Sequence, residues 1–502
     1  MSLNLGIEEY VTAAEHQVKP LIIPLCAEIP MAELSPTGVF QHQIRERGYL
    51  LESIEGSEKI ARYSYIGTDP ELVVTIGSSF RIEGKEPYLS IAQNPPGRDA
   101  IEQLASILRR FNFVNVKAPR FFGGMVGYLS YDLVYTLHHP VLQSQKPEPT
   151  LPYAQFMLTK DCIVFDHKKK TLFIFCSPFL TYDSDLSEEY EQSRDRIIRI
   201  AREIGSIRQS EATQSNRDIP DGQSHSSTES VKKEEFLHVV ERVKEHIRAG
   251  DIFQGVISRR IDVDFGENPF SVYKALRQIN PSPYMYYLDY GDDLQVIGAS
   301  PEMLVRVEKR HVTTVPIAGT RPRGRTPAED EMFARELLAD EKERAEHTML
   351  VDLARNDLGR VCKYSSVRVD DFMEVEQFSH VQHIVSTVQG ALRDNLDGFE
   401  ALKSCFPAGT VSGAPKIRAM QIIDEVEPDR RGLYAGAVGF MGFDQNLEFA
   451  ITIRTIIGRE GILSIQVGAG IVADSVPETE WLETENKARA MINAIHQAGR
   501  YS

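Results

Sequence analysis

The sequence predicts an α+β fold in which antiparallel sheets are flanked by helices. Strand-like runs are grouped and joined by short turns, as in residues 162–176, where a hairpin pattern has its turn at His167 to Lys170. Strands that follow strands, with helices set apart from them, are typical of antiparallel sheets rather than alternating α/β units. Helical periodicity comes in separate blocks at 187–207, 231–250, 327–353 and 478–498.

Further strands are expected in both halves of the chain. A last hairpin covers 447–472, with its turn at 459–461, and leads into the C-terminal helix. The other strands predicted from apolar runs lie at 21–29, 71–77, 252–265, 283–290, 294–300 and 310–318.

One break in composition divides the chain. Residues 206–234 are rich in Ser, Gln, Asp and Thr and almost free of apolar side chains, so they cannot bury enough surface to become ordered. We therefore expect a flexible linker at 206–230 between an N-terminal domain at 1–205 and a second domain at 231–502. A chain of 502 residues is long enough for two large domains.

Composition also narrows the classes of function. The formal net charge of −16 argues against nucleic acid as a partner, because phosphate binding needs a basic face. The five cysteines are widely spaced and odd in number, which indicates reduced thiols rather than a disulfide framework. The first 20 residues lack a signal-peptide pattern, and no run approaches the roughly 18 apolar residues of a membrane span. We expect a cytoplasmic protein without a membrane partner.

Two helical segments each carry an acidic pair. Glu343 and Glu346 are three residues apart in the third helical block. Glu480 and Glu483 repeat this spacing in the last block, so each pair shares one helix face. On exposed helices such pairs are solvated surface. On two facing helices they can hold one divalent ion, since Mg²⁺ takes one or two protein carboxylates and completes its shell with water and substrate.

Three further features suit the binding or processing of a small anion. Arg454 stands in an apolar strand pattern, where its guanidinium needs a carboxylate from either a ligand or the protein. Residues 406–417 expose glycine backbone and hydroxyl groups, as a plain loop or as an anion-binding nest. His383 is either structural or a proton carrier near neutral pH. Together the residues indicate a metal-dependent enzyme for an anionic small molecule.

In these segments the chain resembles the chorismate-utilising enzymes, and within that family the anthranilate-forming members. "YLLESIEG" and "ARYSYIG" carry the similarity in the N-terminal half, so it covers nearly the whole chain except the linker. The resemblance implies the family's two-domain fold. Ten further motifs occur in order across 250–490: "QGVISRR", "ASPEMLVR", "PIAGTRPRG", "EKERAEHTMLVDLARND", "HVQHIVS", "FPAGTVSGAPK", "GLYAGAVG", "FAITIRT", "VGAGIVADS" and "ETENKA".

The resemblance also implies roles for particular residues. Glu346 and Glu483 match the ligands of Mg²⁺, and Glu343 lies beside them among the catalytic positions. His383 matches the histidine near the ring hydroxyl that leaves, and Glu302 matches a carboxylate placed for proton transfer there. The positions that match substrate-binding residues are Thr410, Tyr434, Arg454, Gly468, Gly470, Lys487, Ala318, Gly319 and Thr320.

The implied reaction converts chorismate and ammonia to anthranilate and pyruvate, the first step of tryptophan biosynthesis. Isochorismate- and salicylate-forming relatives have a water-activating lysine where this chain has Gln254, which cannot act as that base. Aminodeoxychorismate-forming relatives have a lysine in the PIxGT motif where this chain has Ala318, so ammonia attacks ring C2 directly. Two alternatives stay open: an aminodeoxychorismate-forming enzyme with an atypical alanine, and a non-catalytic tryptophan-binding protein.

A regulatory site and a partner subunit complete what the resemblance implies. The chain contains no glutamine amidotransferase, so a separate small subunit should supply ammonia, in a heterotetramer of two large and two small subunits. Tryptophan is the expected feedback inhibitor. The residues that resemble its binding site are Leu51, Glu52, Ser53, Asn280, Pro281, Ser282, Tyr284 and Met285.

Overall fold

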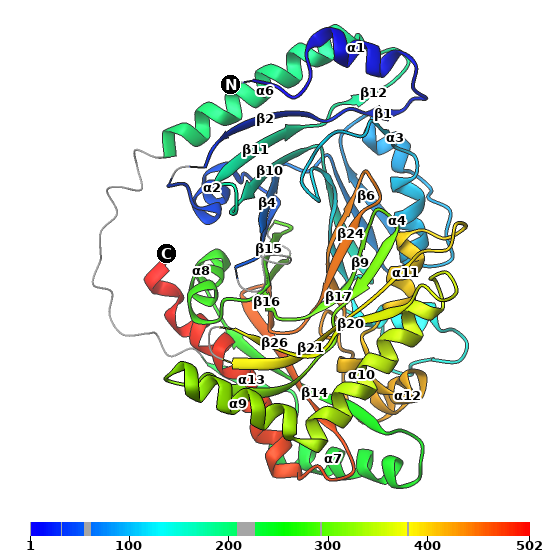
Figure 1. The fold of residues 1–502 in the computed structure, drawn as a ribbon, viewed down its shortest axis with the longest axis vertical. Helices are drawn as coiled ribbons and strands as arrows, with labels where there is room; N and C mark the ends of the chain where they lie inside the picture. Colours follow the sequence, from blue (N-terminus) through cyan, green and yellow to red (C-terminus); the bar gives the residue numbers. More distant parts are fainter. Residues whose placement is uncertain are drawn as a thin grey trace.

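Two large antiparallel sheets form the centre of the molecule, and helices cover their outer faces (Figure 1). This computed structural model describes residues 2–31, 33–54, 62–207, 226–291, 294–378 and 381–501. Residues 208–225 of the predicted linker lie outside the described residues. The predicted α+β class with antiparallel sheets is confirmed.

The first sheet combines strands from both ends of the chain. Its neighbouring strands are all antiparallel, and the short β22 (Gly413–Ala414) pairs with β14 at one end. In hydrogen-bonded order the strands are β13 (Ser227–Glu229), β14 (Gln254–Asp264), β26 (Ile462–Ile471), β25 (Thr455–Arg459), β16 (Gln295–Ser300), β15 (Tyr284–Asp289), β3 (Gly48–Glu52), β4 (Tyr63–Thr68), β10 (Asp161–Asp166), β11 (Thr171–Cys176) and β2 (Leu25–Pro30).

The second sheet is also antiparallel and mixes the two halves in the same way. In order its strands are β19 (Ile317–Pro322), β21 (Val381–Ala391), β18 (His311–Thr314), β17 (Met303–Glu308), β24 (Leu447–Ile451), β23 (Ala437–Gly442), β8 (Gly124–Leu129), β9 (Ala154–Thr159), β5 (Leu72–Ile76) and β6 (Phe80–Gly84), with β20 (Arg368–Gln377) paired to β21. A third, small sheet joins β12 (Phe179–Leu180), β1 (Leu21–Ile22) and β7 (Asn112–Phe113), and its β1–β7 pair is parallel.

Backbone hydrogen bonds connect the two halves of the sequence in both large sheets. In the first sheet β3 pairs with β15, where Leu51 lies opposite Tyr286. In the second, β8 pairs with β23, where Gly127 lies opposite Gly439. Each large sheet therefore contains strands from both 1–205 and 231–502. The division of the chain into two domains at these bounds remains a prediction.

The predicted helices at 187–207, 231–250 and 478–498 are confirmed as α6, α7 and α13. The helices of the described residues are α1 (Ile7–Glu15), α2 (Pro36–Gln43), α3 (Tyr88–Ala92), α4 (Ala100–Leu108), α5 (Val134–Leu137), α6 (Leu186–Ile207), α7 (Lys233–Arg248), α8 (Pro269–Ile279), α9 (Pro327–Ala339), α10 (Glu341–Gly359), α11 (Gly398–Cys405), α12 (Lys416–Val426) and α13 (Pro477–Gln497), with 3₁₀ turns η1 (Tyr131–Leu133), η3 (Gly409–Val411) and η4 (Ala498–Tyr501).

The single helix predicted at 327–353 is wrong, because the chain breaks at Asp340 into α9 and α10. Asp340 adopts an extended backbone, and its carboxylate accepts hydrogen bonds from the backbone N–H groups of Lys342 and Glu343 at 3.0 and 3.2 Å. Such a cap satisfies donors that a helix start leaves free. Continuous helical periodicity concealed this start, although an aspartate three residues before a glutamate is a capping pattern.

The hydrophobic core has three layers. Between the sheets, Tyr65 and Tyr286 of the first sheet pack with Val126 and Phe440 of the second. The rings of Tyr65 and Phe440 meet edge-on at 5.6 Å. Side chains of α6, α8 and α13 cover the outer face of the first sheet, and those of α4 and α11 cover the second. Each large apolar side chain buried in these layers contributes about 1.5–3 kcal/mol.

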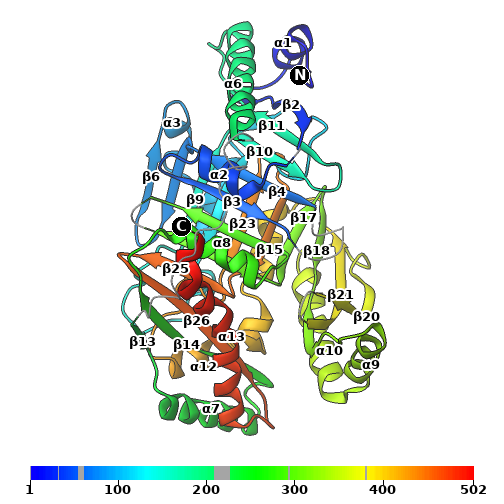
Figure 2. The ribbon, with the colours of Figure 1, turned by 90° about the vertical axis from the view of Figure 1, so that its left-hand side faces the viewer.

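In the lower part of Figure 2, the helices and strands form two separate groups. α13 lies along β14 and β26 on one side, whereas α9, α10, β20 and β21 lie on the other. All five cysteines are buried and have free thiols, as their spacing predicts. None of the helices in the described ranges has the length and apolar character that crossing a bilayer requires.

Candidate active site

A cleft of about 1100 Å³ lies between β14, β26 and α13 on one side and β19, β21 and α10 on the other. Figure 2 shows these two groups of elements apart from one another. The fold thus brings together segments that span more than 200 residues of sequence. The predicted site residues that line the cleft are Glu302, Ala318, Gly319, Thr320, Glu346, His383, Thr410, Tyr434, Arg454, Gly468, Gly470, Glu483 and Lys487.

Glu302 is a buried acid in the cleft wall. It lies between β16 and β17, and its Oε1 accepts a hydrogen bond from Thr410 Oγ1 at 2.9 Å. Burial raises the pKa of Glu302 to about 8, against smaller lowering effects of the Thr410 hydrogen bond and of Lys487. A carboxyl group with this pKa is protonated at neutral pH and can give its proton to a leaving group.

His383 reaches the cleft from β21 as a neutral imidazole. Its Nδ1 donates a hydrogen bond to the carbonyl oxygen of Gly319 at 2.7 Å and lies 3.1 Å from Thr320 Oγ1. Burial lowers the pKa of His383; the Gly319 hydrogen bond opposes this shift, and the charge of Arg454 adds to it. With the proton on Nδ1, the other ring nitrogen, Nε2, is left to accept a hydrogen bond or a proton.

Arg454 does not lie inside a strand, so that prediction is wrong. β24 ends at Ile451, β25 begins at Thr455, and Arg454 between them has a φ of +52°. This left-handed backbone ends the strand alternation. Burial lowers the pKa of the Arg454 guanidinium, which has no hydrogen-bond or ion-pair partner among the described residues. A half-buried guanidinium without a partner is a strong site for a carboxylate.

Glu346 of α10 and Glu483 of α13 enter the cleft from opposite helices. Burial raises the pKa of Glu346, the charges of Glu343 and Glu483 add to this, and a hydrogen bond from Gln254 Nε2 at 3.4 Å opposes it. Glu483 Oε1 pairs with Lys487 Nζ at 2.6 Å. Among the described residues, no group of three or more His, Cys, Asp or Glu side chains is arranged so that it could hold a metal ion. Two crowded carboxylates suit a cation that takes its other ligands from water and substrate.

The other two carboxylates of the predicted pairs do not line the cleft. Glu343 accepts a hydrogen bond from Arg321 at 3.3 Å, and the same guanidinium binds Asp340 at 2.9 Å. Glu480 is buried, and burial raises its pKa while a hydrogen bond with Ser475 lowers it. Glu343 therefore supports the start of α10 behind the cleft wall.

The backbone of β19 approaches the cleft closely. Gly319 has a φ of +67°, and an added Cβ would lie 2.9 Å from Leu337 Cδ1 and 3.1 Å from Glu343 Oε2. A larger residue here would strain the backbone and clash, so the position requires glycine. Ala318 pairs with Ile384 of β21 and contributes only a methyl group to the lining.

β26 adds two glycines on the opposite wall. A Cβ at Gly468 would lie 2.5 Å from the Tyr434 hydroxyl, and one at Gly470 would lie 2.8 Å from Gln254 Nε2. The carbonyl oxygen of Gly468 accepts a hydrogen bond from Lys487 Nζ at 2.8 Å. Burial raises the pKa of Tyr434 to about 12, so its hydroxyl remains a neutral donor. The absent side chains leave backbone amides within reach of a ligand.

Several residues of the cleft escaped the sequence analysis. Gln466 alternates with Gly468 and Gly470 along one face of β26, so the strand period alone could have identified it. The others reach the cleft only through tertiary packing. The lining residues that were missed are Val256, Pro301, Ile317, Leu350, Val411, Ile453, Gln466 and Val467.

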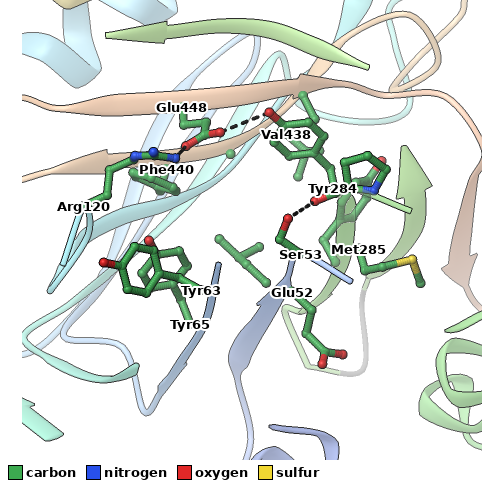
Figure 3. Close-up of a pocket in the computed structure, with 15 residues that line it drawn as sticks. Glu52, Ser53, Tyr63, Tyr65, Arg120, Tyr284, Met285, Val438, Phe440 and Glu448 are labelled. Carbon is green, nitrogen blue, oxygen red and sulfur yellow. Dashed lines mark hydrogen bonds and ion pairs between the residues drawn. The ribbon is translucent and has the colours of Figure 1, made fainter. Parts of the chain in front are cut away.

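A second pocket, of about 540 Å³, lies between the two sheets and contains part of the predicted regulatory site (Figure 3). Asn280 caps the C-terminus of α8, and the carbonyl oxygen of Ser282 accepts a hydrogen bond from the Ile54 backbone at 3.3 Å. Asn280, Pro281 and Ser282 are not among the lining residues. The predicted residues that do line the pocket are Leu51, Glu52, Ser53, Tyr284 and Met285.

Side chains from both sheets that the sequence did not indicate complete the lining of this pocket. Figure 3 shows Glu448 between Arg120 and Tyr284, at 2.8 Å from the guanidinium and 3.0 Å from the hydroxyl. Ser53 Oγ donates a hydrogen bond to the carbonyl oxygen of Pro283 at 2.7 Å. The lining residues that were missed are Tyr63, Tyr65, Arg120, Pro283, Tyr286, Val438, Gly439, Phe440, Glu448 and Ala450.

Comparison with known proteins identifies the family of the chain. A model of the chorismate binding enzymes matches residues 49–493. The chain belongs to this family. It is 46% identical to anthranilate synthase component 1 of Acetivibrio thermocellus, over 95% of this chain and 96% of the relative. It is 44% identical to the protein of the same name from Aquifex aeolicus (strain VF5), over 99% of each chain.

Solved structures of chorismate-binding enzymes share the fold. Anthranilate synthase component I from Streptococcus pneumoniae TIGR4 superposes with a TM-score of 0.71 at 33% identity, covering 92% of this chain and 98% of the other. The menaquinone-specific isochorismate synthase from Escherichia coli superposes with a TM-score of 0.67 over 97% and 98% of the two chains. At 18% identity, the second similarity concerns the fold alone. The family resemblance inferred from the motifs is confirmed.

Proposed function

We propose that this protein is component I of an anthranilate synthase, which converts chorismate and ammonia to anthranilate, pyruvate and water. The observation that carries the proposal is that Ala318 and Gln254 line the cleft where a nucleophilic or water-activating lysine would otherwise stand. The lysine that lines the cleft, Lys487, is held by Glu483 and by the Gly468 carbonyl oxygen. With no such amine at these two positions, free ammonia is the nucleophile.

Charge recognition in the cleft suits a substrate with two carboxylates. Arg454 and Lys487 offset negative charge on one side, and the backbone at Gly468 and Gly470 offers N–H donors beside them. Thr410 and Tyr434 supply hydroxyl groups at the same wall. A guanidinium without a protein partner binds a carboxylate ligand strongly, because the ligand supplies the missing counter-charge.

Mg²⁺ is the proposed cofactor, held by Glu346 and Glu483. Burial and the neighbouring charges of Glu343 and Glu483 raise the pKa of Glu346, so a cation between the two helices would relieve the repulsion. When bound, the ion supplies electrostatic stabilisation to developing negative charge on the substrate. The two protein carboxylates leave most of its coordination shell to water and substrate.

Two side chains of the cleft, Glu302 and His383, provide the proton donor and the hydrogen-bond acceptor that the reaction needs. Glu302, protonated below a pKa of about 8, gives its proton to the C4 hydroxyl as the C4–O bond breaks and water leaves. Ammonia forms the C–N bond at ring C2 and loses one proton, which balances the proton that Glu302 gave to the leaving hydroxyl. His383 accepts a hydrogen bond from the ring hydroxyl at Nε2 and orients it. The C2–H bond and the bond from the ring carbon to the enolpyruvyl oxygen then break, and the ring becomes aromatic. The enolpyruvate that leaves takes up one proton on carbon, equal to the one lost from C2, and becomes pyruvate.

The test is an assay of the purified chain with chorismate, Mg²⁺ and ammonium salt at alkaline pH, followed by anthranilate fluorescence. We expect one pyruvate per anthranilate and loss of the signal with EDTA. A product that retains the enolpyruvyl group would instead indicate an aminodeoxychorismate-forming enzyme. Absence of turnover together with tryptophan binding would indicate a non-catalytic regulatory protein.

We further propose that the second pocket binds tryptophan as a feedback inhibitor. Tyr63, Tyr65 and Phe440 offer aromatic walls for an indole ring, and Arg120 and Glu448 offer opposite charges for a zwitterion. The pocket contacts both sheets, so a ligand there can favour one arrangement of the sheets over another. Inhibition by tryptophan, with kinetics in chorismate measured at several tryptophan concentrations, tests this proposal.

The partner in this proposal is a glutamine amidotransferase subunit, with two large and two small subunits in a cytoplasmic complex. The support is the similarity to proteins named component 1, together with the five free cysteines, which are buried. Addition of the small subunit should allow glutamine to replace ammonium salt. A sedimentation measurement of the mixture should give the mass of a heterotetramer.

A further inference from the structure

A buried ion pair behind the cleft wall takes no part in the chemistry proposed above. Arg431 and Glu427 follow α12, and their side chains are 1% and 4% exposed. The guanidinium and the carboxylate approach to 2.6 Å. A buried pair of this kind is weak evidence for stability, because desolvation costs about as much as the attraction returns. The hydrogen bonds of Arg431 and Glu427 to neighbouring segments indicate a role other than stability.

The fork of Arg431 holds two backbone carbonyls of the cleft wall. Nε and Nη2 donate to the two carboxylate oxygens of Glu427, at 2.9 and 2.6 Å. Nη1 donates to the carbonyl oxygen of Val411 at 2.8 Å, and Nη2 donates to that of Val256 at 2.6 Å. Val411 belongs to η3 and Val256 to β14, and both residues line the cleft. One rigid planar group therefore fixes two separate segments of the wall.

Glu427 extends this network to β26. Its Oε1 accepts hydrogen bonds from the backbone N–H and the hydroxyl of Ser258, at 2.7 and 2.9 Å. The hydroxyl of Ser258 in turn accepts one from Gln466 Nε2 at 2.9 Å, and Gln466 lines the cleft. The guanidinium also lies 5.5 Å from the ring centre of Tyr434, another lining residue.

We propose that Arg431 and Glu427 are positioning residues that set the relative placement of β14, η3, Tyr434 and Gln466 around the substrate. The most important consequence concerns η3, because Thr410 precedes Val411 and donates the hydrogen bond to Glu302. The proposal rests on the proposed function of the cleft. Apolar residues could fill the same space, but they could not fix four acceptors in one plane.

The test compares Arg431→Lys with Glu427→Gln. Arg431→Lys keeps the charge but loses the planar fork, whereas Glu427→Gln keeps the shape but loses the charge. The matched control is Arg196→Lys, because Arg196 pairs with Asp161 between α6 and β10, outside the cleft. For Arg431→Lys, we expect kcat/KM to fall by about tenfold to a hundredfold, as for a displacement near 1 Å in an active site. The control should keep the wild-type value.

Two readouts separate positioning from a general loss of stability. A loosened Thr410 hydrogen bond raises the pKa of Glu302, so the alkaline limb of the pH profile should move to higher pH in Arg431→Lys. The Val256 N–H donates to the Ser412 carbonyl oxygen at 3.0 Å, and its hydrogen exchange should become at least about tenfold faster. Neither change is expected in Arg196→Lys.

The possible outcomes are distinct. A folded Arg431→Lys with wild-type kcat/KM, pH profile and exchange overturns the proposal, as does lower activity without either of the two readouts. If Arg431→Lys fails to fold, the isosteric Glu427→Gln is held to the same criteria. If the wild-type chain forms no anthranilate, the proposed function fails, and exchange at Val256 then decides the positioning role by itself.

Discussion

The cleft and the pocket between the sheets differ in how their charges are paired. In the cleft, Arg454 is half-buried and its guanidinium has no partner among the described residues, and the Glu302 carboxyl group has only the hydrogen bond from Thr410. In the pocket, Arg120 pairs with Glu448 at 2.8 Å, and Glu52 on the pocket lining pairs with an arginine outside it at 3.0 Å. Lys487 in the cleft does pair with Glu483, so the difference lies at Arg454. Among the described residues, this guanidinium has no counter-charge, whereas the charged side chains on the pocket lining are paired.

This difference indicates what each site binds. An unpaired charge in a buried site costs free energy until a ligand supplies its partner, so the cleft favours a ligand with net charge. A pocket with internally paired charges and aromatic walls favours a ligand with no net charge and a large apolar surface. A dianion such as chorismate fits the first description, and a zwitterionic aromatic amino acid fits the second.

The largest effect is expected from Glu302→Gln, which keeps the shape of the side chain but removes its proton. General acid catalysis contributes roughly 10²–10⁴ in rate, so we expect kcat to fall within that range. Wild-type rates, expressed per free ammonia, should fall above a pKa of about 8 as Glu302 ionises. Stopped-time fluorescence across pH 6–10 checks both points. An unchanged alkaline limb in the variant would assign it to another group.

Arg454→Met should weaken the use of chorismate in the cleft without changing tryptophan binding in the pocket between the sheets. Removal of a charge that binds a ligand carboxylate costs about 2–5 kcal/mol, so kcat/KM for chorismate should fall by roughly thirtyfold to four-thousandfold. Tryptophan binding, measured by calorimetry, should stay at the wild-type value. The control is Arg459→Met, at an exposed end of β25. Equal losses in both variants would contradict the contrast between the two sites.

Ser53→Phe should have the reverse effect. The larger side chain occupies the pocket, and overpacking costs about 1–3 kcal/mol, so the tryptophan concentration for half-inhibition should rise by roughly fivefold to 150-fold. The KM for chorismate should not change, because Ser53 is not part of the cleft. Ser187→Phe, at an exposed position of α6, serves as the control. Inhibition at the wild-type concentration would place the tryptophan site elsewhere.

The smallest effect concerns stability. The folded pKa of Glu302, about 8, lies above the usual glutamate value, so its stabilising contribution is complete at low pH and is lost as pH rises through 8. Glu302→Gln stays neutral and should avoid this loss, with a relative gain on the order of 1–3 kcal/mol between pH 6 and pH 9. Urea unfolding at the two pH values measures it, with exposed Glu460→Gln as reference. A pH-independent difference would mean that Glu302 is ionised in the fold.

The spacing of apolar residues predicted helices and strands correctly where a single helical or strand period continued through the whole element. The terminal helix with Glu483 and the turn at 459–461 lie where their periodicity placed them. The predicted hairpin at 447–472 is wrong in its first arm, because β24 belongs to the second sheet and only β25 and β26 form the hairpin. Two local errors have local causes. The capping aspartate at 340 interrupts a continuous helical period, and the left-handed backbone at Arg454 interrupts a continuous strand period. Neither interruption changes the apolar pattern from which the prediction was made.

The sequence by itself determined the family, the chemical types in the cleft and the absence of a lysine at Ala318 and Gln254, because motifs and residue identities are local properties. Only the tertiary structure decided that both halves share two sheets, that Glu346 and Glu483 line one cleft from two different helices, and that burial raises the pKa of Glu302. It also placed Arg431 against the carbonyl oxygens of Val411 and Val256. Burial and charge pairing depend on neighbours from distant segments, and no local pattern records which segments those are.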